Sequence, residues 1–157
     1  MDDVNELRKA WLREDFAASE TIAAGLSLDP LARRGASALE ACVSGAATPA
    51  EVRDVLRIAH DREQWAGAHA AFSAVRDRTL AAESSARGRA TAELALLYAA
   101  ENVARLLYNA TDPPDPFDAD SGAWMLHSIA TLVRFTSGSD LGERVWSIIA
   151  RDLPQCS

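Results

Sequence analysis

The chain has 157 residues, of which 48% are hydrophobic and 25% are charged, and its net charge is −7. This composition is typical of a globular domain that buries a core of its own, and it excludes a disordered chain. The negative charge argues against a nucleic-acid partner, because binding to phosphates requires a concentrated basic surface.

The sequence contains neither a predicted membrane span nor a secretory signal. The longest uncharged run, residues 121–133, includes Ser, Thr and His and falls short of the roughly 20 apolar residues that a spanning helix needs. Residues 1–6 are acidic where a signal peptide would be basic and then apolar. Two cysteines, Cys42 and Cys156, are too few for a disulfide framework. We therefore expect a cytoplasmic protein.

Apolar residues at helical spacing dominate the first third of the chain. The stripe over residues 4–22 predicts one helix that ends near Ala24. Asp29-Pro30 predicts the start of a second helix, which stops at Gly45. Thr48-Pro49-Ala50-Glu51 is the clearest start signal, with a Thr cap, a proline in the first turn and Glu three residues after the Thr.

The middle of the chain continues the same pattern. Asp61-Arg62-Glu63-Gln64 repeats the capping motif, so a break or bend is expected near His60. Helical spacing then continues to Leu80. Ser84 or Ser85 is expected to cap the next helix, which ends near Asn109 and is apolar on all sides between residues 94 and 100.

The last third predicts two further helices. One covers residues 123–135 and is closed by Ser137-Gly138, and the other begins at Asp140-Leu141-Gly142-Glu143 and ends before Pro154. No segment alternates polar and apolar residues with a period of two, so no sheet is expected. The sequence predicts an all-α protein: a compact bundle of six to seven helices, mostly antiparallel neighbours, forming one domain over residues 1–157.

A loop rich in proline and aspartate, residues 111–122, separates two predicted helices and contains no basic residue. Capping of the next helix by Asp120 or Ser121 explains part of the pattern without a ligand. A calcium loop matches poorly, because Gly122 is at the fifth position instead of the sixth and no Glu closes the loop. The remaining interpretation is an acidic recognition loop in which Phe117 is an anchor within a rim of carboxylates: Asp112, Asp115, Asp118 and Asp120.

Polar side chains also lie on the most apolar predicted helix. One side of this helix carries Tyr98, Glu101, Arg105, Tyr108 and, beside them, Asn109. The simpler interpretation is an ion pair within the helix, since Glu101 and Arg105 are four residues apart. The alternative is a cleft for a small polar ligand, with this stripe as its floor, the 111–122 loop as its cover, and Trp124 and His127 opposite.

Common catalytic and metal-binding signatures were not found. The sequence has no His-Glu-x-x-His, no Glu-x-x-His pair, no Gly-x-Ser-x-Gly and no phosphate-binding glycine loop. We expect no metal and no cofactor, and the balance is against an enzyme, although one assembled from distant residues remains open. The four tryptophans lie on ordinary core stripes.

The function hypothesis is a small acidic protein-interaction module, of the inhibitor, immunity or regulatory kind, that uses the aspartate-rich loop. The alternative is a small-molecule-binding or enzymatic bundle with a polar pocket around Glu101 and Arg105. The expected partner is another protein, since the negative charge suits a basic one. A second copy is the other option, in a homodimer that buries the last helices and Trp146.

Overall fold

The helices of the chain are joined mainly by short turns in a computed structural model, which describes residues 3–43, 48–111, 120–136 and 139–151. Within these ranges there are eight α-helices, one 3-10 helix and no strand, which confirms the all-α prediction with a slightly higher helix count. The elements are α1 (Asp3–Leu12), α2 (Phe16–Ala24), α3 (Leu28–Cys42), α4 (Ala50–Ala59), η2 (Arg62–Gly67), α5 (Ala68–Ala86), α6 (Ala92–Asn109), α7 (Ser121–Phe135) and α8 (Ser139–Ala150).

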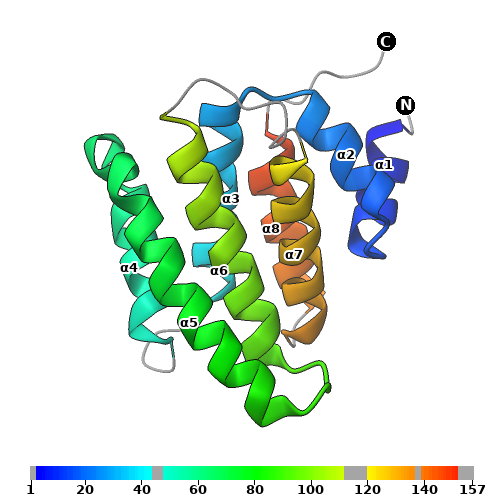
Figure 1. The fold of residues 1–157 in the computed structure, drawn as a ribbon. Coiled ribbons are helices and arrows are strands. Elements are labelled where there is room, and N and C mark those ends of the chain that lie inside the picture. The colour runs from blue at the N-terminus through cyan, green and yellow to red at the C-terminus, as the bar shows by residue number, and fades with distance from the viewer. Residues whose placement is uncertain (1–2, 44–47, 112–119, 137–138, 152–157) are drawn as a thin grey trace.

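Helix α6 lies at the centre of the bundle, in contact with α3, α4, α5 and α7. It runs antiparallel to α5 on one side and to α7 on the other, while α1 and α2 lie beside α7 at the edge of the bundle (Figure 1). Helix α8 packs against α3 behind this row. The central position explains why the sequence of α6 is apolar on all sides, as predicted.

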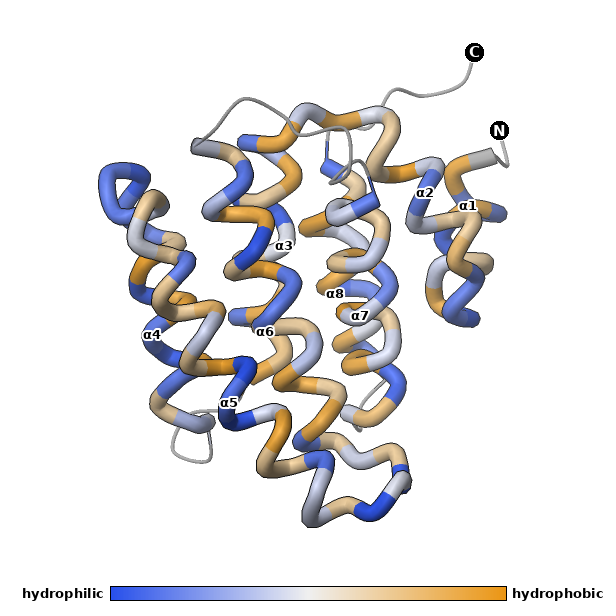
Figure 2. Tube along the Cα trace, viewed as in Figure 1, coloured by the Kyte–Doolittle hydropathy of each residue, from blue (hydrophilic) through white to orange (hydrophobic). Residues whose placement is uncertain are grey.

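The core is built from small and large apolar residues, many of them Ala, Leu, Val and Ile. Hydrophobic residues recur along α6 and α7 (Figure 2), whereas α5 carries a run of four hydrophilic residues at 76–79. Leu97, Leu106 and Leu107 of α6 are fully buried, and each such side chain contributes about 2 kcal/mol by leaving water. No helix among the described residues is both long enough and apolar enough to cross a membrane.

Two glycines allow α7 to approach its neighbours closely. A Cβ atom built on Gly35 of α3 would meet the side chain of Met125 on α7, with 2.6 Å to its terminal methyl carbon. A Cβ atom on Gly122 would collide with a methyl group of Leu31 on α3. Met125 and Leu31 are buried, so these contacts fix the distance between α3 and α7.

The prediction of one helix over residues 4–24 was wrong, because the chain breaks between Leu12 and Phe16. Glu14 adopts the left-handed conformation, with φ of 64°, and Asp15 caps α2 by accepting a hydrogen bond from the Ala17 N–H. The turn places the Glu14 carboxylate against α7, where it accepts hydrogen bonds from side chains of that helix. A tertiary contact therefore outweighs the local helical periodicity.

Helix starts were also shifted from their predicted positions. Helix α3 begins at Leu28, and Asp29 binds arginine side chains instead of capping the helix. Helix α5 continues through both predicted serine caps and ends at Ala86, where Arg87 is the C-cap residue and is left-handed with φ of 53°. Thr91 is the residue that caps α6, since its hydroxyl accepts a hydrogen bond from the Leu94 N–H.

Candidate functional site

Most of the large exposed apolar side chains of the described residues lie between α6 and α7. The large ones are Leu80, Tyr98, Trp124 and Phe135, which are 50%, 36%, 51% and 40% exposed. Tyr98, Trp124 and Phe135 line two hollows between these helices, and Leu80 lies on α5 one turn before Glu83, which also lines one of them. Exposed apolar side chains gathered in this way are typical of a binding surface.

The two hollows adjoin and form one groove. The first, which we call the Trp124 hollow, has a volume of about 180 Å³ and is lined by Trp124 and His127 of α7 and Asn102 of α6. The second, the Phe135 hollow, has a volume of about 330 Å³ and extends to the turn between α5 and α6. Ala95, Tyr98 and Thr131 line both hollows, and together the two form what we call the α6–α7 groove.

Two polar side chains of the groove, those of Asn102 and Thr131, form hydrogen bonds within the protein. The Asn102 amide donates to the Ser128 hydroxyl at 2.8 Å and to the Tyr98 carbonyl at 2.9 Å. The Thr131 hydroxyl donates to the Glu14 carboxylate at 2.7 Å. These hydrogen bonds hold both side chains in place and engage the Asn102 amide N–H groups and the Thr131 hydroxyl proton, so the floor offers few free donors to a polar ligand.

The Trp124 and His127 rings, which line the Trp124 hollow, pack against a ring of α2. The ring of Phe16 on α2 lies 4.5 Å from that of Trp124 and 5.5 Å from that of His127, between ring centroids. Nδ1 of His127 is buried and has no hydrogen-bond partner among the described residues. Asp120 directly precedes α7, one turn before Trp124; it is exposed, and its side chain makes no capping hydrogen bond.

A tyrosine–carboxylate hydrogen bond forms one wall of the Phe135 hollow. The Tyr98 hydroxyl donates to the Glu83 carboxylate at 2.5 Å, which joins α6 to the end of α5. This hydrogen bond, with partial burial, raises the pKa of Tyr98 to about 12. Tyr98 is therefore a neutral donor at physiological pH, and its ring is held in place between the two hollows.

The predicted ion pair between Glu101 and Arg105 is wrong in the described structure. Glu101 is 7% exposed and faces α5, where its Oε1 lies 3.4 Å from an Arg76 nitrogen. Arg105 instead places its guanidinium 5.2 Å from the centre of the Phe72 ring. Neither Glu101 nor Arg105 lines the α6–α7 groove, since both side chains are held on the α5 side of the helix.

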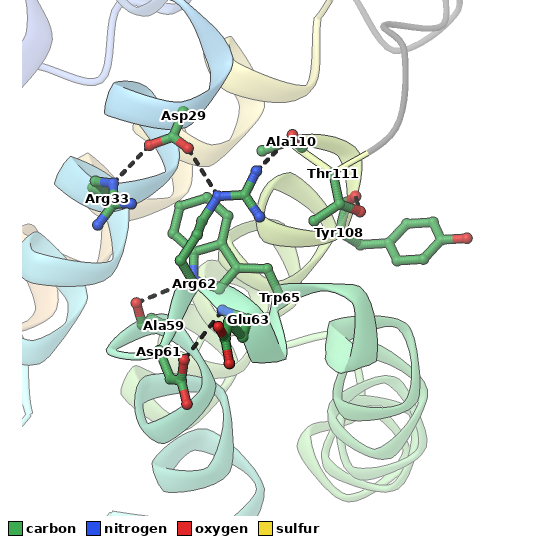
Figure 3. Close-up of polar contacts among 10 residues, drawn as sticks. All are labelled: Asp29, Arg33, Ala59, Asp61, Arg62, Glu63, Trp65, Tyr108, Ala110 and Thr111. Carbon is green, nitrogen blue, oxygen red and sulfur yellow. Dashed lines mark hydrogen bonds and ion pairs between the residues drawn. The ribbon is translucent and has the colours of Figure 1, made fainter.

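An arginine network stabilises the opposite end of α6. Arg62 donates to the Asp29 carboxylate at 2.9 Å and to the Ala110 carbonyl at 3.4 Å, and so joins α3 to the last turn of α6 (Figure 3). Its guanidinium lies 4.6 Å from the ring of buried Trp65, and that of Arg33 lies 5.0 Å from the same ring. These cation–π contacts and ion pairs fix the point at which the 111–122 loop begins.

Tyr108 and Asn109 are near this network and away from the groove. The Tyr108 ring points away from Trp65 and Arg62 (Figure 3) and packs 5.2 Å from the His69 ring. The side-chain nitrogen of Asn109 is buried and has no hydrogen-bond partner among the described residues. The structure thus separates the predicted polar stripe into a groove residue, Tyr98, and residues with other contacts.

The structure places three of the predicted binding residues together. Tyr98, Trp124 and His127 line the same hollow, and Asp120 lies four residues before Trp124 in the sequence. Four further predicted residues lie outside the described part of the chain: Asp112, Asp115, Phe117 and Asp118.

Sequence reasoning missed Thr131, Phe135 and the α5–α6 turn as parts of the groove. Phe135 ends a helix whose apolar stripe predicts burial, and its 40% exposure depends on how the helix packs. Trp124 is likewise not a core residue, contrary to the expectation for all four tryptophans. Trp146 is 7% exposed and packs 5.9 Å from the Trp11 ring, so it offers little surface to a second copy.

No protein-family model matches the chain, and neither a curated protein nor a solved structure matches it significantly.

Proposed function

We propose that this chain is an acidic protein-interaction module that binds a partner segment in the α6–α7 groove. The observation that carries the proposal is the position of Tyr98, Trp124 and Phe135, three exposed aromatic side chains that line one groove. Aromatic side chains in a cavity are the residues that most often dominate the free energy of protein–protein binding. The net charge of −7 adds steering toward a basic partner.

The dimensions of the groove support a helical segment as the occupant. Trp124 and Phe135 mark its ends on α7, and eleven residues of helix span about 16 Å. A partner helix of about three turns has this length and presents apolar side chains at positions i, i+4 and i+7 on one face. Such side chains match a groove that has two hollows in series, lined largely by apolar groups.

The proposal is tested by selecting displayed peptides of about fifteen residues, built on a helix-favouring frame, against the immobilised chain. Synthetic versions of the enriched peptides are then titrated by fluorescence anisotropy against the wild type, Trp124→Ala and Phe135→Ala. We expect enrichment of apolar residues at i, i+4 and i+7. Trp124→Ala should weaken binding about 100-fold, since the exposed half of the indole is the largest apolar surface on offer.

Two controls distinguish a lost contact from a lost fold. Far-ultraviolet circular dichroism and the urea midpoint of each variant show whether the bundle is intact. Trp124→Phe keeps an aromatic ring and should recover most of the affinity. If no enriched peptide loses affinity in Trp124→Ala or Phe135→Ala while both variants remain folded, the groove is not the binding surface.

A small-molecule function is the second candidate, and the volume of the Phe135 hollow supports it. About 330 Å³ is within the range of pockets that hold small ligands. A thermal-shift screen tests this candidate, because a tight ligand raises the melting temperature by mass action. A ligand whose thermal shift is lost in Phe135→Ala would favour this candidate. A ligand whose thermal shift is lost only in Glu101→Gln would bind elsewhere on the chain.

A further inference from the structure

The chemistry of the partner follows from charges at the Trp124 end of the groove. Trp124 is 51% exposed, so a large part of its ring meets solvent. The backbone N–H of Trp124 donates to the backbone carbonyl of Asp120 at 3.0 Å, which places the two residues one helical turn apart on the same side of α7. The Asp120 carboxylate is exposed and makes no capping hydrogen bond. An exposed indole and an exposed carboxylate one helical turn apart form an environment that attracts a cationic side chain.

Three arginines on or near α6 and α7 contact groups other than Trp124 in the described part of the chain. Arg89 is in the Phe135 hollow and donates to the Ala86 carbonyl at 3.3 Å. Arg105 is over the Phe72 ring on the α5 side. Arg134 is paired with Glu14 at 2.8 Å. Each of these guanidiniums is thus engaged with a group other than Trp124.

Charge also decides between another protein and a second copy of the chain. Two copies that each carry −7 repel one another, and the repulsion disfavours a dimer across two identical grooves. A basic partner has the opposite sign and associates faster. The acidic balance therefore favours a different protein as the occupant.

We infer, on the basis of the proposed function, that the occupant of the α6–α7 groove is a basic amphipathic helix of another protein. Its apolar residues fill the two hollows, and a Lys or Arg side chain on its flank lies over the exposed face of Trp124 beside the Asp120 carboxylate. The apolar residues supply most of the affinity, and the cation sets the orientation of the helix and its selectivity.

The test uses three synthetic peptides of about fifteen residues on the same Ala–Gln helical frame, each with Leu at i, i+4 and i+7. They differ only at two flanking positions, one near each end, which carry Arg, Gln or Glu. With Arg at both ends, a cation reaches Trp124 in either orientation of the helix. Affinity is measured by fluorescence anisotropy at low and at physiological salt.

The Arg peptide should bind about tenfold more tightly than the Gln peptide and still more tightly than the Glu peptide, with the difference reduced at higher salt. Asp120→Asn should reduce the ratio of Arg-peptide to Gln-peptide affinity about threefold, and Asp120→Glu should keep the ratio near that of the wild type. The matched control is Asp77→Asn, which removes one exposed carboxylate on α5 that does not line the groove. Because Asp77→Asn makes the same change in net charge, it should leave the preference unchanged.

Two results overturn the inference and leave the groove intact as a binding surface. One is equal affinity of the wild type for the three peptides, together with weaker binding of all three to Trp124→Ala. The other is an equal effect of Asp120→Asn and Asp77→Asn, which would reduce the preference to overall charge. A dimer in light scattering that Trp124→Ala dissociates would identify a second copy as the occupant. Failure of the Arg peptide to bind also overturns the inference, while the display selection tests the groove independently.

Discussion

Gly35→Ala tests the close packing of α3 against α7 that holds the groove helix in place. A Cβ atom at position 35 would lie 2.6 Å from the terminal methyl carbon of Met125 and closer still to its sulfur. Met125 is fully buried, so its side chain has little room to move away. Overpacking of this kind costs about 1–3 kcal/mol, whereas alanine gains about 1 kcal/mol over glycine inside a helix. We therefore expect a net loss of about 1 kcal/mol in the free energy of unfolding.

The assay is urea denaturation followed by circular dichroism at 222 nm, in which a lower midpoint at an unchanged slope reports lost stability. Gly67→Ala is the matched control, because a Cβ atom there meets nothing within 4 Å and should cost nothing. Met125→Ala combined with Gly35→Ala should cost less than the two single changes added together, since the new methyl group enters the vacated space. A Gly35→Ala variant as stable as Gly67→Ala, or an additive cycle, would refute the packing argument.

Three further predictions concern local chemistry. In Tyr108→Phe, which leaves Tyr98 as the sole tyrosine, absorbance at 295 nm should report a pKa of about 12. Adding Glu83→Gln should lower it, and an unchanged value would contradict the hydrogen bond. Arg87→Gly should raise the free energy of unfolding by about 1 kcal/mol, seen as a higher urea midpoint, because the residue is left-handed with φ of 53°. A lower midpoint would count against strain there. Burial alone would raise the pKa of Glu14, but hydrogen bonds from α7 lower it below its ordinary 4.5. The stability that ionised Glu14 adds is fully present above about pH 4.5 and is lost as the pH falls through the lowered pKa. Glu14→Gln should therefore make stability fall less steeply with acid in a stability–pH curve.

The fold class was readable from the sequence because the helical period of apolar residues reflects burial directly. The all-sided apolar run of α6 predicted its central position, and the capping motif at Asp61 marked a real start, since its carboxylate accepts a hydrogen bond from the Glu63 N–H. Breaks were harder to predict when tertiary contacts caused them. The turn at Glu14 depends on bonding to Thr131 and Arg134, far away in sequence.

The candidate site was only partly predictable, because exposure at the surface depends on how the helices pack. Tyr98, Trp124 and His127 were singled out together, and the structure places them around one hollow. Phe135 gave no signal, since an exposed and a buried aromatic residue at the end of an apolar stripe look alike in sequence. The partner of Glu101 was likewise not readable, because Arg76 is on another helix.

The central claim, that the α6–α7 groove binds a helical segment, is tested most directly by fluorine NMR of the tryptophans. The chain has four, and Trp124 is 51% exposed whereas the other three are 0–7% exposed. Protein labelled with 5-fluorotryptophan is titrated with the tightest display-selected peptide, and Trp124→Phe assigns the resonance. The account predicts that the Trp124 resonance shifts in proportion to occupancy while those of Trp11, Trp65 and Trp146 stay in place. A bound peptide that leaves the Trp124 resonance unmoved would contradict it.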